Sequence, residues 1–498
     1  MPPKGKKKNS GKKKKEKPLK QTGPTKKDFD VKINKGCELQ ETAGPLADLQ
    51  RKLDILKQAE QEYTEVLHYF PTHLDALYNL GTCLIEQAEV CDEVLEKDCT
   101  SSGVDPQNCM HEREVMLNRA LEVLKTEIAS DTSHRGEATG LAHKTLAQLF
   151  RVRVQYCQKD FMKGRRSDRP PASLVYDTYE QACTNFQRAT EILQTLRGGA
   201  EHVAEAYVEW AETQVEMMEI LLREEGEQAL LQSHSSLSTA TELYSQALNQ
   251  VVGTGDSDLQ LICDKASAVH HFTVTYIEKL EKGMQPLPQI DLNLLVAHGQ
   301  NSVNAVLALH PTSEPGLLLQ AQFLHMLALM EKLASDASSY ISKAEAAREA
   351  FDAVAKAYPQ SIDVQSASLE FLFEHGKVLV QTSVGGETNL KDLAFQHIQE
   401  AFRLCQHCLQ ASPGDLFLAY NMVCISATLG NKDLCKESFT QYLTILSSIE
   451  QGSEEEKQAQ EFNVTLSDLL SDEDINDIKN ESWLQEMLPP ALKVTINT

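Results

Sequence analysis

The sequence predicts an all-α protein, and three observations support this. From about residue 40 onward, apolar residues recur at intervals of three and four, the period of an amphipathic helix, with little of the alternation typical of strands. Long stretches such as residues 200–231 contain no run of β-branched residues and no cluster of turn residues. With 498 residues, 41% of them hydrophobic, the chain is long enough for three domains or one extended helical array.

The N-terminal segment, residues 1–40, is predicted to be a disordered lysine-rich arm. Residues 1–35 hold 14 lysines and three acidic residues, a net charge of +11; because the whole chain carries −24, the remainder carries −35. The arm has one aromatic residue, Phe29, and no arginine, so it can neutralise phosphates but not read bases. Its first 20 residues contain Lys4, Lys6, Lys7, Lys8, Lys12, Lys13, Lys14, Lys15, Lys17 and Lys20. RNA or ribosome contact, a nuclear import signal and an arm that folds back on the acidic body remain open.

A pair of packed helices is predicted in residues 59–84. Ala59, Tyr63 and Val66 lie at i, i+4 and i+7 and share one helical face. The small residue allows close helix approach, and the aromatic residue fills the gap beside it. Pro71 lacks a backbone N–H and disfavours helix in the residue before it, so the first helix ends there. The second helix carries the apolar and small residues Leu77, Leu80, Gly81 and Leu84.

The same face recurs further along the chain. The sets are Ala182, Phe186 and Ala189; Ala240, Tyr244 and Ala247; Ala347, Phe351 and Val354, followed by Pro359; and Ala401, Cys405 and Cys408, followed by Pro413. Weaker copies are Gly299, Val303 and Val306 with Pro311, and Cys435, Phe439 and Tyr442. In this register Cys405 and Cys408 fill the positions of Tyr63 and Val66. The CxxC sequence is therefore interpreted as buried packing residues rather than half of a zinc site, and no metal or cofactor is expected.

This spacing resembles that of the tetratricopeptide repeat, a helix-turn-helix unit of about 34 residues. The resemblance implies a right-handed superhelical solenoid of helical hairpins over residues 41–447, with loop insertions near 91–114 and 158–174. Proteins of this superfamily bind peptides, helices or folded partners on an extended concave surface, and catalysis is rare among them. The resemblance implies an adaptor, a scaffold or a dedicated chaperone with a protein partner.

The charge of the chain after the arm favours a basic partner, because −35 over residues 36–498 complements ribosomal proteins, histone tails and arginine-rich segments. The clamp with which some tetratricopeptide proteins hold the acidic C-terminus of chaperones is not matched. Asn79 stands at one clamp position, but Gly44 and Asp48 stand where lysine and asparagine are needed. The alternative is a ribosome- or RNA-associated factor, in translation or ribosome assembly, that works through the lysine-rich arm.

No enzyme is expected, because the sequence lacks the short motifs for phosphate binding, serine nucleophiles and zinc proteases. The lysines at the N-terminus are not followed by an apolar stretch, so a secretory signal is not expected. The most apolar segment, residues 316–330, is interrupted by polar residues and too short to cross a bilayer. We expect a cytoplasmic or nuclear protein with reduced thiols, no membrane contact and no small-molecule substrate.

Residues 448–498 change character to an acidic linker followed by an amphipathic segment. This segment contains Trp483, Leu484, Met487 and Leu488, including one of only two tryptophans in the chain. It is either a short motif for the groove of a partner or a helix that caps the last exposed face of the array. We favour the cap.

Overall fold

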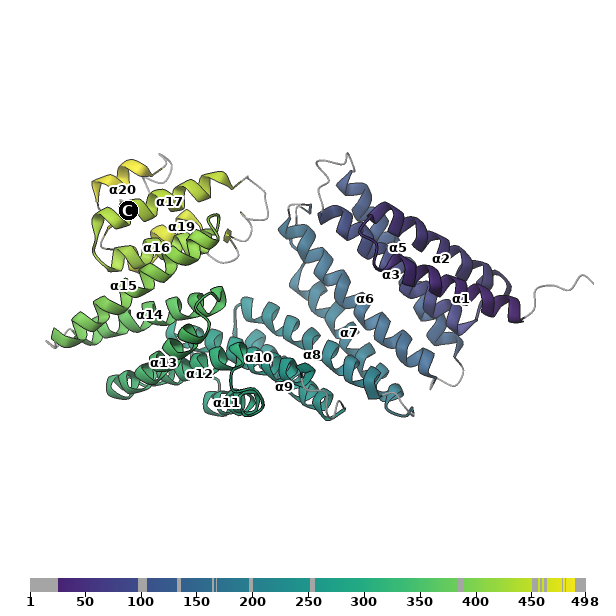
Figure 1. Cartoon of the computed structure of the whole chain (residues 1–498), viewed down its shortest axis with the longest axis horizontal. Coiled ribbons are helices and arrows are strands. Elements are labelled where there is room, and N and C mark those ends of the chain that lie inside the picture. Colours follow the sequence, from purple (N-terminus) through teal and green to yellow (C-terminus); the bar gives the residue numbers. More distant parts are fainter. Residues whose placement is uncertain are drawn as a thin grey trace, which may run out of the picture. The chain divides into compact units, whose positions relative to one another are not determined.

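The computed structural model describes residues 26–96, 105–131, 136–163, 165–166, 168–196, 200–250, 256–383, 388–449, 456, 459–460, 464–476, 478–479 and 481–488. The regular secondary structure of these residues is helical throughout, so the predicted all-α class is confirmed (Figure 1). The chain divides into two compact units, Met1–Ser130 and Asp131–Thr498. Within the described ranges, no helix has both the length and the hydropathy that a membrane crossing needs.

The described residues of the first unit form a stack of four helices. They are α1 (Lys26–Ala43), α2 (Leu49–Tyr69), α3 (Leu74–Glu96) and α5 (Pro106–Ser130). Each packs against the next in sequence: α1 on α2, α2 on α3 and α3 on α5. The short connections and consecutive packing are those of antiparallel helical hairpins.

Helix α1 corrects the predicted extent of the arm, because regular structure begins at Lys26 and not after residue 40. Phe29 is only 2% exposed, and its ring lies 5.6 Å from that of Tyr69 and 4.8 Å from that of Phe70. Lys32 pairs with Glu62 and Glu65, and Lys35 pairs with Glu62. Aromatic packing and ion pairs with α2 therefore order residues whose composition alone suggested disorder. The ten lysines between residues 4 and 20 lie outside the described residues.

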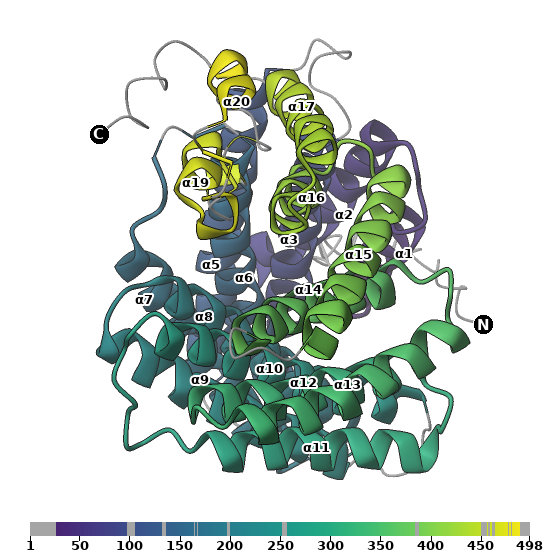
Figure 2. The ribbon, with the colours of Figure 1, turned by 90° about the vertical axis from the view of Figure 1, so that its left-hand side faces the viewer.

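The second unit continues as helical hairpins, which Figures 1 and 2 show following one another. The helices are α6 (Glu137–Met162), α7 (Ala172–Leu193), α8 (Ala200–Arg223), α9 (Glu227–Gln250), α10 (Asp256–Glu281), α11 (Leu292–Leu309), α12 (Glu314–Leu333), α13 (Ala337–Ala357), α14 (Ile362–Thr382), α15 (Thr388–Ala411), α16 (Leu416–Thr428) and α17 (Lys432–Ser448). The first helix of a hairpin also contacts the first helix of the next, as α8 does α10, α10 does α12 and α12 does α14. This stacking brings the first helices to one common face.

The prolines predicted to end helices lie just beyond helix ends. Phe70 and His310, which precede Pro71 and Pro311, share a φ of −133° and a ψ of 81°, a non-helical conformation consistent with the exclusion of helix before a proline ring. Two residues after Pro311, Pro359 and Pro413, the side chains of the N-cap residues Ser313, Ser361 and Asp415 accept a hydrogen bond from the next helix. The same local sequence therefore ends one helix and starts the next.

The predicted packing faces are buried. Ala59, Tyr63 and Val66 are fully inaccessible to solvent, and the corresponding residues of the other sets are nearly so: Ala182, Phe186, Ala189, Ala240, Tyr244, Ala247, Ala347, Phe351, Val354, Ala401, Cys405 and Cys408. On the facing helix Leu77, Leu80, Gly81 and Leu84 are also buried. The fold is an array of stacked helical hairpins, built on the predicted packing pattern.

The predicted loop insertions are shorter than residues 91–114 and 158–174. Helix α3 continues to Glu96 and α5 begins at Pro106, while α6 continues to Met162 and α7 begins at Ala172. Arg113 reaches back to Asp92 with an N–O distance of 2.7 Å, so buried charge pairing extends both helices of this hairpin into the expected loop. Helices of this length exceed those of an ordinary repeat, which is why the sequence suggested inserted loops.

The C-terminal segment covers the last hairpin. It contains α19 (Leu466–Ser471), the 3-10 helix η2 (Glu473–Ile475) and α20 (Ser482–Met487). The segment shares one apolar core with α16 and α17, to which it contributes Leu466, Leu469, Ile475, Ile478, Leu484 and Leu488. The hydroxyl of Tyr442 donates to the carbonyl of Val464 at 2.9 Å. This packing has the form of a cap.

Candidate functional site

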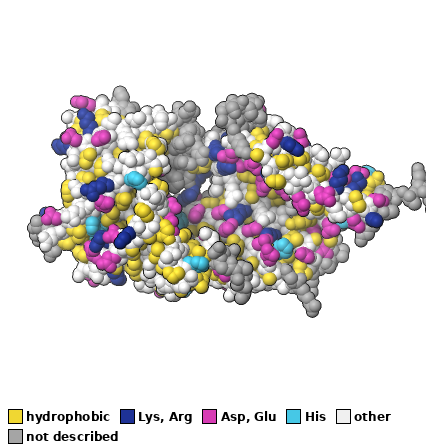
Figure 3. Space-filling view, in the orientation of Figure 1, with side chains coloured by type: hydrophobic (Ala, Val, Ile, Leu, Met, Phe, Trp, Pro, Cys, Tyr) yellow, Lys and Arg dark blue, Asp and Glu magenta, His cyan; other side chains and the backbone are white. Residues whose placement is uncertain are grey.

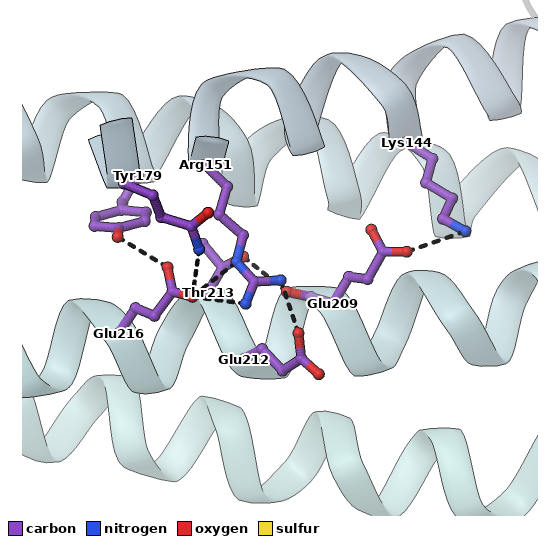
Figure 4. Close-up of polar contacts among 8 residues, drawn as sticks. Lys144, Arg151, Tyr179, Glu209, Glu212, Thr213 and Glu216 are labelled. Atoms are coloured by element: carbon purple, nitrogen blue, oxygen red, sulfur yellow. Dashed lines mark hydrogen bonds and ion pairs between the residues drawn. The ribbon is translucent and has the colours of Figure 1, made fainter. Parts of the chain in front are cut away.

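The common face of the first helices in the second unit carries two different arrangements of charge. Between α6 and α8, basic side chains of one helix lie opposite acidic side chains of the other (Figure 4). Between α10 and α16, acidic side chains line a groove. The number and position of the carboxylates in each region determine where a charged ligand can bind.

The cations between α6 and α8 are paired with carboxylates within the protein. Lys144 lies 2.7 Å from Glu205 and 3.2 Å from Glu209. Arg151 lies 2.7 Å from Glu212 and 2.6 Å from Glu216, and the hydroxyl of Tyr179 donates to Glu216 at 2.8 Å (Figure 4). Each cation here has two carboxylates within reach, so both cations are engaged within the protein, and the four carboxylates leave a net charge of −2.

The groove has a volume of about 630 Å³ and is formed by α10, α12, α13, α14 and α16, together with residues 472–474 of the C-terminal segment. Seven carboxylates and two lysines line it. The carboxylates belong to Glu278, Glu281, Glu370, Glu374, Asp472, Glu473 and Asp474, and the lysines are Lys282 and Lys377. Apolar side chains lie among them, including Phe417, which is 44% exposed. On the face that Figure 3 shows, acidic, basic and apolar side chains of the described residues are interspersed.

Lys377 fixes one wall of the groove. Its Nζ lies 2.8 Å from a carboxylate oxygen of Glu374 and 3.2 Å from one of Asp474, and 4.7 Å from the ring centre of Phe373. Burial lowers the pKa of Lys377, but Glu374 and Asp474 raise it more, so the net direction is upward. Burial likewise raises the pKa of Glu374, yet nearby cations, Lys377 foremost, bring it below its usual value. These charges stay ionised and hold residue 474 against α14.

The opposite side of residues 472–474 is held by α16. The hydroxyl of Tyr420 donates to Asp472 at 2.7 Å, and the thiol of Cys424 lies 3.8 Å from the same oxygen. Ligand atoms of Cys424, Asp472 and Asp474 lie within 4.8 Å of one another, the spacing of a metal site. Burial raises the pKa of the Cys424 thiol well above its usual range. Since a metal would need the thiolate and would meet the ammonium of Lys377, the trio is better explained as the anchor of the C-terminal segment.

Two acidic residues of the groove form no ion pair with a described residue, although the nearby ammonium of Lys282 acts to lower the pKa of Glu278. Glu278 on α10 and Glu370 on α14 are exposed to solvent within the groove and form no ion pair with any described residue. The groove walls remove part of their hydration, which raises the pKa of both carboxyls. The charge of Glu278 contributes to the shift at Glu370, so the two carboxylates repel each other.

Of the candidate residues taken from the sequence, Phe351 lines the groove, whereas the cysteine pair and the C-terminal segment lie elsewhere. Cys405 donates to the carbonyl of Leu418 at 3.2 Å, Cys408 is fully buried, and burial raises the pKa of Cys405 to about 12, as expected of packing thiols. Leu484 and Leu488 are buried against the last hairpin, and Trp483 and Met487 pack on the same core. These four side chains are already occupied, which argues against the alternative of a motif for a partner's groove.

Sequence reasoning missed the groove and its residues. The available signal was the recurrence of acidic residues on the helix face opposite the packing face, as in Glu278 with Glu281 and Glu370 with Glu374. Such pairs are also typical of solvated helix surfaces, so the signal is weak until the helices are placed in space.

No protein-family model and no curated protein sequence matches the chain. Among solved structures, the S. pombe nuclear import adaptor Nro1 aligns with a TM-score of 0.47 and 16% identity, over 68% of this chain and 98% of that one. The C-terminal part of a TPR repeat-containing protein from Cytophaga hutchinsonii aligns with a TM-score of 0.40 and 9% identity, over 75% and 95%. The human IFIT1 dimer with PPP-AAAA aligns with a TM-score of 0.22 and 13% identity, over 86% and 96%.

Proposed function

We propose that the protein is an adaptor or scaffold that binds a basic segment of a protein partner in the groove of α10, α12, α14 and α16. The observation that carries the proposal is the composition of that groove, in which seven carboxylates face two lysines. Complementary charge favours association with a lysine- or arginine-rich segment and speeds the encounter. A dedicated chaperone for a basic client would use the same surface.

The shape of the groove also supports a peptide-like ligand. Its volume of about 630 Å³ accommodates several side chains, and exposed Phe417 offers apolar contact beside the carboxylates. The lysine of the wall, Lys377, is engaged by two carboxylates and is not poised for chemistry. We therefore propose binding rather than catalysis.

Site-specific photo-crosslinking tests this proposal. A benzoylphenylalanine at Phe417 reports on the groove, and one at Phe395, which is 48% exposed on α15 and outside the groove, is the matched control. We expect the Phe417 probe alone to crosslink peptides rich in lysine and arginine in a cell lysate, with a yield that falls as salt is raised. Equal crosslinking from both positions, or crosslinks to acidic peptides, would contradict the proposal.

The lysine-rich arm supports a second candidate, a ribosome- or RNA-associated role. Ten lysines and a single acidic residue, Glu16, precede residue 21, and an arm of this composition binds phosphates without reading sequence. Deleting residues 1–25 leaves α1 intact. If this candidate holds, the deletion abolishes salt-sensitive co-sedimentation with ribosomes; if the arm is an import signal, it changes nuclear accumulation instead.

A further inference from the structure

One layer of the groove shows how the first helices hold a cation. Lys332 of α12 places its Nζ 2.9 Å from Glu281 of α10 and 3.9 Å from Glu374 of α14. Three consecutive first helices therefore converge on one ammonium group, with a carboxylate on each side and the cation from the helix between them. The protein satisfies this layer by itself.

The layer one helical turn nearer the N-termini has the same walls, but the helix between them contributes no cation. Counting back three residues from Glu281 and Lys332, and four from Glu374, gives Glu278, Leu329 and Glu370. Residues three or four apart share a helix face, so Glu278, Leu329 and Glu370 lie one helical turn before the layer that contains Lys332. All three of these residues line the groove. Leucine stands where the neighbouring layer has lysine, and the carboxylates of Glu278 and Glu370 remain unpaired among the described residues.

The lining of the groove offers a second unsatisfied group in the next turn. The Nε2 atom of His325, four residues before Leu329, is inaccessible to solvent and has no hydrogen-bond partner among the described residues. Burial lowers the pKa of His325 to about 4, so the ring is neutral near pH 7 and can bind a polar ligand. An unpaired buried nitrogen in the same groove as two carboxylates without an ion pair indicates a ligand with hydrogen-bond donors.

We propose that Glu278 and Glu370 bind the guanidinium group of an arginine side chain of the partner, with the aliphatic part of that side chain on Leu329. The inference rests on the proposed function and names the chemical group recognised at the same groove. A guanidinium is planar and has five N–H donors, so it can pair with carboxylates on two opposite walls. It is also less strongly hydrated than an ammonium, which suits a floor made of leucine.

Fluorescence anisotropy on the full-length protein tests the assignment. The probe is a labelled dodecapeptide of alanine and glycine with three arginines, compared with the same peptide carrying lysine or citrulline. We expect the arginine peptide to bind, the lysine peptide to bind more weakly and the citrulline peptide not to bind. Glu278→Gln with Glu370→Gln should weaken arginine-peptide binding about tenfold. Glu349→Gln with Glu437→Gln, exposed glutamates on α13 and α17 outside the groove, should leave it unchanged.

A second variant keeps both carboxylates and places a lysine side chain of the protein itself between them. Leu329→Lys recreates the neighbouring layer, so we expect its ammonium to pair with Glu278 and Glu370 and to weaken the arginine peptide about tenfold as well. Circular dichroism establishes that each variant is folded. The arginine assignment is overturned if both variants bind the arginine peptide as tightly as the unmodified protein does, or if the unmodified protein binds the lysine and arginine peptides equally well. Neither result would affect the crosslinking expected at Phe417. Loss of that crosslinking in the unmodified groove would instead refute the proposed function.

Discussion

Replacing Gly299 with alanine tests whether close helix approach at the small position holds the hairpins together. Gly299 lies on α11, and a Cβ atom added there would lie 2.0 Å from Cζ and 2.2 Å from Cε1 of Phe323 on α12. Carbon atoms prefer about 3.5–4.0 Å, so the ring would have to move by more than 1 Å. Phe323 is buried, which leaves the ring little room to move.

The magnitude follows from two opposing effects. Overpacking of this kind costs about 1–3 kcal/mol. Alanine in a helix gains roughly 0.5–1 kcal/mol over glycine. The net expectation for Gly299→Ala is a loss of about 1–2 kcal/mol in the free energy of unfolding, although alanine is the better helix former.

Urea denaturation followed by circular dichroism measures this loss as a lower midpoint with an unchanged slope. Gly414→Ala is the control, because nothing lies within 4 Å of its added Cβ. Combining Gly299→Ala with Phe323→Leu should recover part of the loss relative to the sum of the single changes, because the two sites share one contact. If Gly299→Ala is as stable as Gly414→Ala, the close-approach explanation is wrong.

Three further predictions concern the arm boundary, the CxxC pair and acid sensitivity. Phe29→Ala should weaken the packing of α1 on α2 by about 3 kcal/mol and so speed tryptic cleavage after Lys32. Asp30→Ala, the control, should leave the rate of this cleavage unchanged. Cys405→Ala and Cys408→Ala should each lower the free energy of unfolding by about 0.5–1.5 kcal/mol, because packing contacts are lost. EDTA should not shift the urea midpoint of the wild type, and a shift would indicate a bound metal. Burial lowers the pKa of His270 to about 4, so between about pH 6.5 and pH 4 this side chain is protonated in the unfolded chain but neutral in the folded chain. The free energy of unfolding should therefore fall as the pH drops from 6.5 to 4. The urea midpoint of His270→Leu should fall less over the same pH range.

The packing of the hairpins could be predicted from the sequence because its determinants are local. Ala59, Tyr63 and Val66 share a face through helical spacing alone, and Pro71 marks the helix end through its own backbone chemistry. The same reasoning placed Cys405 at a buried position without any knowledge of its neighbours. Patterns within one helix and its turn carry this information.

The arm boundary and the groove could not be predicted, because both depend on residues brought together by folding. Phe29 lies in a lysine-rich segment, and only contact with Tyr69 and Phe70 makes it a core residue. Glu278 and Glu370 are on helices separated by α12, and nothing in either local sequence indicates that they share a groove. The sequence predicted a basic partner from total charge alone and could not place its binding surface.

The C-terminal cap has a consequence for the synthesis of the protein. The cores of α16 and α17 are complete only when residues up to Leu488 have been added, since Leu484 and Leu488 belong to that core. A polypeptide released early by the ribosome would leave Phe439 and Tyr442 uncovered and present an apolar surface to chaperones and proteases. Folding of the hairpin of α16 and α17 is thus completed only after the residues that cover it, up to Leu488, have been synthesised.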